Sequence, residues 1–186
     1  MFESELSGIL LAVGVVLLLL TVLVLRRVVR QRMAQRAIRD PLTGTYTADF
    51  IQEVYQAELR RAERTGVPFS LALVALNDPS EHGELAASPD VSLAMAKWLK
   101  RNVRSSDYVG RLEDNRFALV LPETWEEDAK AVAARIKGSF RYQPKPSGTE
   151  RWLTCNVGVA TWTPENPDVW AGAAKGLEDA TVTVNA

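Results

Sequence analysis

The sequence predicts an α/β fold, a mixed sheet flanked by helices, preceded by a single transmembrane helix. Three observations predict it. An uncharged apolar run opens the chain, amphipathic segments with helical spacing alternate with short apolar segments after it, and one of those short segments is apolar throughout. With 186 residues, 47% of them apolar and 24% charged, the chain is long enough for one ordinary domain and a small additional segment.

The run from Leu6 to Leu25 contains no charged residue. At 1.5 Å per residue, a helix of about 20 residues spans a bilayer core of roughly 30 Å. A cleaved signal peptide would have a basic leading end, whereas this run follows Glu3 and Glu5 and meets Arg26 directly. We interpret it as a permanent anchor. The domain boundaries predicted are 1–27 for the anchor, 28–39 for a basic juxtamembrane helix and 40–186 for the domain.

Basic residues are concentrated directly after the apolar run. Five arginines between positions 26 and 36 are the only basic residues before position 37, and the 17 basic and 21 acidic residues that follow give the remainder a formal charge of −4. This mildly acidic body has no general electrostatic footprint for nucleic acid. Arginines after an apolar span favour a single-pass protein of the inner (cytoplasmic) membrane, with its N-terminus outside and its C-terminal domain in the cytoplasm.

The chain has one cysteine, Cys155, and one histidine, His82. A single cysteine excludes a disulfide within the chain, and we expect it to be a small buried side chain in a reducing compartment. Because no second cysteine or histidine is present, a zinc site is not expected, and His82 is interpreted as a solvated loop residue.

Two helices are predicted between the apolar run and residue 67. A helix over 28–39 is expected to end before Pro41, because the residue before a proline is disfavoured in helical backbone. Thr47 or Asp49 can cap a second helix, whose apolar positions keep a period near 3.6 and which Gly66 stops.

Strands are predicted where apolar residues follow one another or alternate. The unbroken run 69–76 is typical of a central strand covered on both faces. Residues 104–122 predict two short strands around a turn, because three of the four residues from Glu113 to Arg116 are charged and must lie at an exposed tip. The other elements expected are a loop over 78–89, helices over 91–103 and 123–140, a loop over 142–150, a strand over 153–161, a short helix over 168–180 and an edge strand over 181–184.

Four segments form a pattern by their order and spacing. They are Asp40-Pro41-Leu42-Thr43-Gly44, the apolar run 69–76, Arg104 to Asp107 followed by Arg111, and Asn156 to Ala160. Together they resemble GGDEF domains, the bacterial diguanylate cyclases, over about residues 40–180. The resemblance implies a five-stranded sheet flanked by helices, like the catalytic core of adenylyl cyclases. It also implies the condensation of two GTP molecules, one per protomer, into cyclic di-GMP with two Mg²⁺ ions.

The sequence departs from this family at the positions that would hold the metal. The resemblance places the two signature glycines at Glu113 and Asp114, the metal-binding acid of the turn at Asn115, the next acid at Arg116, and the metal-binding strand at Ala75, in the aspartate position, and Asn77. Mg²⁺ is held by hard oxygen ligands, so these replacements remove most of the metal cage. We therefore expect no catalytic residues, no bound metal and no cofactor; Mg²⁺ is expected only if the protein is an enzyme after all.

Arg104 and Asp107 retain the spacing RxxD, which in the family often marks an inhibitory site for a cyclic di-GMP dimer. An arginine fork suits phosphate and the guanine edge, and an aspartate can accept from guanine N–H groups. An alternative interpretation is purely structural: Asp107 caps the turn between helix and strand, and Arg104 is a solvated cation in the last helical turn.

Three functions are compatible with these observations. The first is an inactive, membrane-anchored GGDEF-like domain that acts by binding, either as a scaffold or dimerisation module or as a cyclic di-GMP receptor through Arg104 and Asp107. The second is a diguanylate cyclase with a remodelled metal site, and the third is a structural subunit of a membrane assembly without nucleotide binding. The carboxylates available to a remodelled site are Asp78, Glu81, Glu84 and Asp114. The expected partners are the membrane through residues 6–25, cyclic di-GMP, and a second copy of the chain or a larger membrane assembly.

Overall fold

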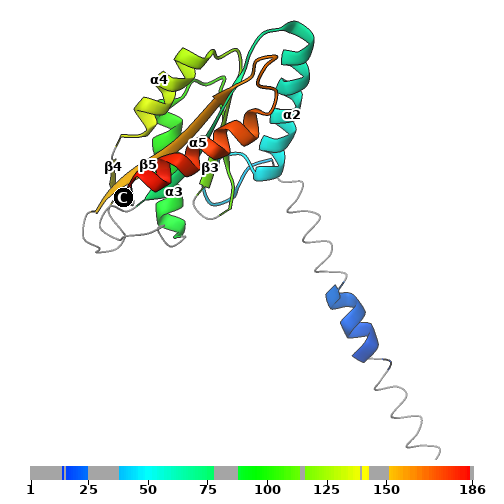
Figure 1. Cartoon of the computed structure of the whole chain (residues 1–186). Coiled ribbons are helices and arrows are strands. Elements are labelled where there is room, and N and C mark those ends of the chain that lie inside the picture. The colour runs from blue at the N-terminus through cyan, green and yellow to red at the C-terminus, as the bar shows by residue number, and fades with distance from the viewer. Residues whose placement is uncertain are drawn as a thin grey trace, which may run out of the picture. The chain divides into compact units, whose positions relative to one another are not determined.

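The computed structural model describes residues 14, 16–24, 38–77, 88–113, 116–138, 140–142 and 151–184. The chain divides into two units, Met1–Ala37 and Ile38–Ala186 (Figure 1). In the first unit, Gly14 and residues 16–24 are helical. None of the described helices combines the length and the apolar character needed to cross a bilayer. Half of the predicted span 6–25 and most of the predicted helix 28–39 lie outside the described residues.

The second unit is a five-stranded sheet with helices on both faces, as the resemblance implied. Its elements are α2 (Ala48–Thr65), β1 (Ser70–Asn77), α3 (Pro89–Asn102), β2 (Tyr108–Arg111), β3 (Arg116–Leu121), α4 (Glu126–Ile136), β4 (Phe140–Tyr142), β5 (Arg151–Thr161) and α5 (Val169–Val184). The strand order is β2-β3-β1-β5-β4, and every neighbouring pair is antiparallel. The expectation of a mixed sheet was therefore wrong for these strands. Strands that lie next to each other in the sheet run in opposite directions.

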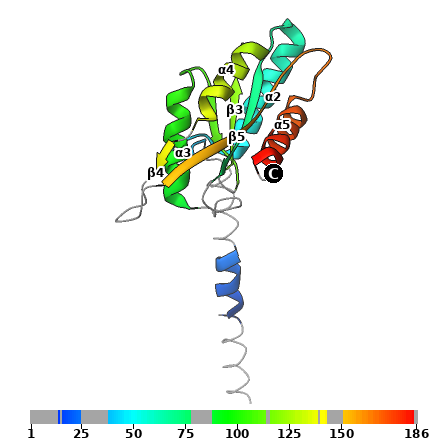
Figure 2. The same ribbon diagram turned by 60° about the vertical axis from the view of Figure 1, so that its left-hand side comes forward.

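The helices form two layers, with α3 and α4 on one face of the sheet and α2 and α5 on the other (Figure 2). β1 lies at the centre, and its side chains alternate between the layers. Val74 and Leu76 pack with α3 and α4, whereas Leu73 and Ala75 pack with α2 and α5. All residues from 69 to 76 are buried, which confirms the predicted central strand.

The capping residues of α2 confirm the predicted ends of this helix. The Thr47 side chain accepts a hydrogen bond from the Phe50 N–H at 3.4 Å, the usual N-cap contact. At the other end Gly66 adopts φ 70°, and its N–H donates to the Ala62 carbonyl at 2.8 Å. A left-handed residue at this position favours glycine, so the helix stops where the sequence predicted. Cys155 is buried, as expected.

Two helices were predicted to include residues that are not helical. Ile38 and Arg39 are not helical, because Arg39 pairs with Tyr46 in an isolated β-bridge instead. The helix predicted over 123–140 is limited to α4, and Phe140 begins β4. Phe140 pairs with Leu153 of β5 and stacks on Trp98 of α3, so sheet pairing takes over from the helical pattern there.

The edge strand predicted over 181–184 was wrong, because α5 continues to Val184. The Thr181 hydroxyl donates to the Leu177 carbonyl at 2.8 Å and accepts from the Asn156 side chain at 3.2 Å. These contacts fix the last helical turn against β5 and override the strand preference of the residues. The fifth strand that the resemblance implied is β4.

Candidate functional site

Three residues lie side by side on neighbouring strands at one end of the sheet. Ala75 of β1 pairs with Arg116 of β3 and with Asn156 of β5. Directly opposite side chains of antiparallel strands project from the same face. Ala75 is 6% exposed and belongs to the apolar cluster under α2 and α5, and Asn156 is bonded to Thr181 of α5. This cross-sheet row therefore presents a guanidinium, a methyl group and a carboxamide, with no carboxylate for a divalent cation.

The β1–β3 register brings together positions that the sequence had assigned to one site. Ala75 lies opposite Arg116, which follows the polar turn. Glu113 and Arg116 are exposed, and the Arg116 N–H donates to the Glu113 carbonyl at 3.0 Å, so the turn is the exposed tip predicted. Asn77 ends β1 opposite Thr154. Asp114, Asn115, His82 and the carboxylates of residues 78–84 lie outside the described residues. Among the described residues, no group of three His, Cys, Asp or Glu could hold a metal ion.

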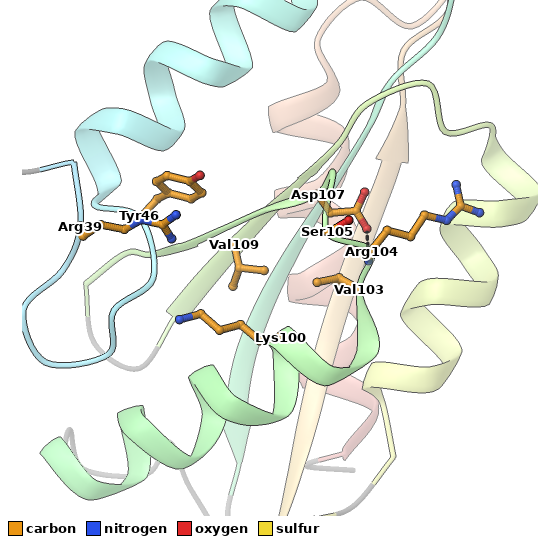
Figure 3. Close-up of a pocket in the computed structure, with 8 residues that line it drawn as sticks. All are labelled: Arg39, Tyr46, Lys100, Val103, Arg104, Ser105, Asp107 and Val109. Carbon is orange, nitrogen blue, oxygen red and sulfur yellow. Dashed lines mark hydrogen bonds between the residues drawn. The ribbon is translucent and has the colours of Figure 1, made fainter.

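Arg104 and Asp107 lie in one turn between α3 and β2. The Arg104 backbone N–H donates to Asp107 Oδ2 at 2.7 Å, and the Asp107 N–H donates to the Arg104 carbonyl at 3.1 Å. The carboxylate therefore caps the turn, as the structural interpretation expected. The Arg104 guanidinium points away from Asp107 and is exposed (Figure 3). The turn therefore occupies Asp107 Oδ2, whereas the Arg104 side chain is exposed.

The segment 38–47 is fastened to β2. Asp40 accepts from the Thr43 N–H at 2.8 Å, from the Thr43 hydroxyl at 2.7 Å and from Arg111 Nη1 at 3.3 Å. The Tyr46 N–H donates to the Val109 carbonyl, and the Arg111 N–H donates to the Tyr46 carbonyl. Burial raises the pKa of Asp40, but the Thr43 hydrogen bonds and the Arg111 charge outweigh it, and the pKa is lowered.

A pocket of about 310 Å³ lies between this segment, the end of α3 and β2, and Figure 3 labels the eight residues that line it. Lys100 Nζ donates to the Gly44 carbonyl at 2.9 Å and to the Thr43 carbonyl at 3.4 Å. Arg39 Nη1 donates to the same Gly44 oxygen at 3.3 Å, and the Arg39 guanidinium lies 3.8 Å from the centroid of the Tyr46 ring. Burial, and then the neighbouring Arg39 charge, lower the pKa of Lys100.

The sequence analysis missed Arg39 and Lys100. A signal was present for Lys100, since no acidic residue lies within four positions of it on either side. Helical cations without an acid at i±3 or i±4 have no intrahelical ion pair and are available for another contact. For Arg39 the sequence carries no such signal, because the tight turn through Gly44, at φ 63°, is what brings it to α3.

We expect Asp40→Asn to destabilise the domain. The change removes the charge that Thr43 and Arg111 stabilise, and hydrogen bonds to charged groups contribute about 2 kcal/mol to the free energy of unfolding. Since the folded pKa is lowered, the wild-type contribution is complete above the unfolded value of about 3.9 and disappears as the pH falls through the folded pKa. Urea unfolding of wild type and variant should therefore differ at pH 7 and converge as the pH falls below the folded pKa of Asp40.

The matched control is Glu53→Gln, which neutralises an exposed carboxylate on α2. Its free energy of unfolding should lie within about 0.5 kcal/mol of wild type. Equal unfolding curves for Asp40→Asn and Glu53→Gln at pH 7 would show that the Asp40 contacts contribute nothing to stability.

The fold resembles that of known GGDEF domains. The structure of the FimX GGDEF domain from Pseudomonas aeruginosa superimposes with a TM-score of 0.67 and 22% identity, and covers 79% of this chain and 95% of that chain. The GGDEF domain of DgcB from Caulobacter crescentus, in complex with cyclic di-GMP, has a TM-score of 0.67 and 15% identity, and covers 78% of this chain and 88% of that one. At these identities the likeness establishes the fold.

Sequence comparison establishes the family. The model of the family described as "Diguanylate cyclase, GGDEF domain" matches residues 37–180, so the chain belongs to the GGDEF family. A curated relative, the diguanylate cyclase DgcP of Pseudomonas aeruginosa, is 25% identical over 139 residues, which are 69% of this chain and 20% of that protein. The chain spans between about a fifth and two fifths of the length of the curated relatives it matches.

Proposed function

We propose that this chain is a catalytically inactive GGDEF domain that acts by binding. It serves as a scaffold or dimerisation module and as a receptor for cyclic di-GMP. The observation that carries the proposal is the cross-sheet row, in which Ala75 and Arg116 occupy neighbouring positions where the family resemblance expects acids.

Phosphoryl transfer depends on cations that neutralise the charge of the triphosphate in the transition state. Ala75 has no ligand atom, and its methyl group is packed among apolar side chains. Arg116 carries the wrong charge for a metal ligand, and Glu113 carries a negative charge at a position where the family has a glycine next to an anion. These residues therefore favour a role in binding over one in metal-dependent catalysis.

The pocket beside Arg104 supports a receptor role. It carries three cationic side chains, Arg39, Lys100 and Arg104, against one acid, Asp107, whose Oδ2 already accepts from the turn. A phosphodiester is an anion that such a group attracts. A solved relative, DgcB, is described in complex with cyclic di-GMP, which makes this dinucleotide the first ligand to test.

The proposal includes a membrane anchor at residues 1–27, a juxtamembrane segment at 28–39 and the GGDEF domain at 40–186. The valine and leucine side chains of the described helix 16–24 are exposed, which favours an apolar environment for them. Together with the uncharged run 6–25 and the arginines after it, this supports a single-pass protein of the inner membrane with a cytoplasmic domain.

Two alternatives make different predictions. A remodelled cyclase is favoured by the activity named for the relatives, and it requires turnover of GTP. A structural subunit requires neither turnover nor nucleotide binding. A similar structure, diguanylate cyclase SiaD from Pseudomonas aeruginosa, is described in complex with its activator SiaC, which supports testing this chain for a protein partner.

Titration calorimetry of the full chain in detergent with cyclic di-GMP tests the receptor role. Binding heat is expected with wild type, and Arg104→Ala should weaken the affinity at least about tenfold, as loss of one charged hydrogen bond would. The control Arg101→Ala removes an exposed cation from the end of α3, three residues before Arg104, that does not line the pocket, and it should bind like wild type. Absence of heat with wild type rejects the receptor role.

Co-purification from detergent extracts tests the scaffold role separately. A partner or second copy that is retained by wild type would support it. Recovery of the chain as a monomer without partners would contradict it.

A further inference from the structure

Arg39 and Lys100 are two positive charges held side by side. They come from segments far apart in the sequence, and both donate to the carbonyl oxygen of Gly44. Neither forms an ion pair within the part of the chain that the structure describes. Like charges this close repel each other, and a bound anion would relieve that repulsion.

Both cations are also fixed in place before any ligand arrives. Lys100 has two of its three donors engaged by the Gly44 and Thr43 carbonyls, and the Arg39 guanidinium lies over the Tyr46 ring. Side chains that are already ordered lose less rotamer entropy on binding. Donors remain on both groups, since a lysine has three and an arginine five.

The remainder of the pocket suits a ligand with an apolar part. Val109 is buried and Val103 is half-buried, and both line the pocket (Figure 3). Ser105 adds an exposed hydroxyl. At about 310 Å³ the pocket is at the lower end of the range for small-molecule sites, which fits one phosphorylated nucleoside unit better than a whole cyclic dinucleotide.

We propose that Arg39 and Lys100 form the phosphate subsite of this pocket, with the nucleoside of the same unit over Val103 and Val109. Arg104 lies at the opposite side and contacts the part of the ligand that projects from the pocket. This inference rests on the receptor role proposed above and assigns the phosphate contact to residues outside the RxxD turn. It extends to any ligand that presents a phosphate on such a unit.

The test compares Lys100→Met with Lys97→Met in the full chain. Both remove an exposed lysine of α3, but Lys97 does not line the pocket. We expect Lys100→Met and Arg39→Met each to weaken cyclic di-GMP binding at least about tenfold, and Lys97→Met to change it less than about twofold. Lys100→Arg retains a charged donor and should restore most of the affinity.

Thermal unfolding separates binding from folding, since Lys100 also fastens the segment 38–47 to α3.

Titrations with inorganic phosphate and with GMP distinguish a general phosphate site from one that also needs the nucleoside. We expect GMP to bind more tightly than phosphate. Equal affinities for the two would overturn the proposed contact of the nucleoside with Val103 and Val109.

The two proposals fail in different ways. If wild type binds cyclic di-GMP and folded Lys100→Met and Arg39→Met bind it equally well, the phosphate subsite is wrong and the receptor role stands. If wild type binds GMP in a Lys100-dependent manner but not cyclic di-GMP, the subsite stands and the receptor role is wrong. If no phosphate-bearing ligand binds, both are wrong.

Discussion

Purified protein incubated with GTP and Mg²⁺ or Mn²⁺ is expected to release no cyclic di-GMP. Removing a single charge-stabilising group from an active site lowers kcat about 10²- to 10³-fold. Here the cross-sheet row replaces two expected acids with Ala75 and Arg116, so we expect a rate at least about 10⁴-fold below that of an intact relative. Mass spectrometry of the reaction mixture measures this directly, with a GGDEF domain of an active relative assayed in parallel.

The opposite result would support the remodelled cyclase. If product forms, the variants Asp78→Asn and Asp114→Asn would show whether these carboxylates hold the metal instead. Loss of product in either variant, with an unchanged unfolding temperature, would establish a different metal site and overturn the proposed inactivity.

A second experiment tests whether the expected inactivity is caused by the absence of carboxylate oxygen atoms at these positions. The variant that carries Ala75→Asp, Glu113→Gly, Asp114→Gly, Asn115→Asp and Arg116→Glu restores the residues that the family resemblance expects. We expect it to bind Mn²⁺ with measurable heat, whereas wild type should show none. If both proteins bind Mn²⁺ equally, the replaced acids are not what determines metal binding.

Gly158→Ala is expected to cause the largest loss of stability of any single substitution considered for this protein. A Cβ atom at Gly158 of β5 would lie 2.1 Å from the Ala173 carbonyl oxygen and 2.2 Å from the Leu177 nitrogen, both backbone atoms of α5. Backbone cannot move aside like a flexible side chain, so α5 must separate from the sheet. Overpacking typically costs about 1–3 kcal/mol, and we expect about 3 kcal/mol or more here, measured by urea unfolding.

Gly138→Ala is the control for Gly158→Ala. Its added Cβ would meet nothing closer than 3.5 Å, and Gly138 has no positive φ, so the free energy of unfolding should change by less than about 0.5 kcal/mol. A loss of stability in Gly158→Ala no greater than that of the control would mean that α5 does not pack on β5 as closely as the structure shows.

Local patterns predicted most of the elements, but not where one kind of structure gives way to another. The apolar run 69–76 predicts the central strand because a strand buried on both faces has no polar positions. β4 was missed because a strand of three residues has too few positions to show alternation, although its pairing partner β5 is the next element along the chain. Residues 181–184 have the composition of a strand, yet contacts of Thr181 with Asn156 and Leu177 keep them helical.

The candidate sites were predictable to different degrees. That Ala75, Asn115 and Arg116 differ from the acids that the family resemblance expects is visible in the sequence alone. That Ala75 and Arg116 are neighbours on one face required the β1–β3 register. The proximity of Arg39 and Lys100 was not predictable from the sequence. It depends on a tight turn that places the Gly44 carbonyl oxygen where both side chains donate to it.

The sequence alone determined which chemical groups this protein has, and with them the family and the proposed loss of the metal-binding acids, because side-chain identity does not depend on folding. Only the tertiary structure decided which groups meet: a methyl beside a guanidinium on the sheet, and two cations in one pocket. These contacts arise from strand register and from a tight turn, which depend on packing between segments distant in the chain.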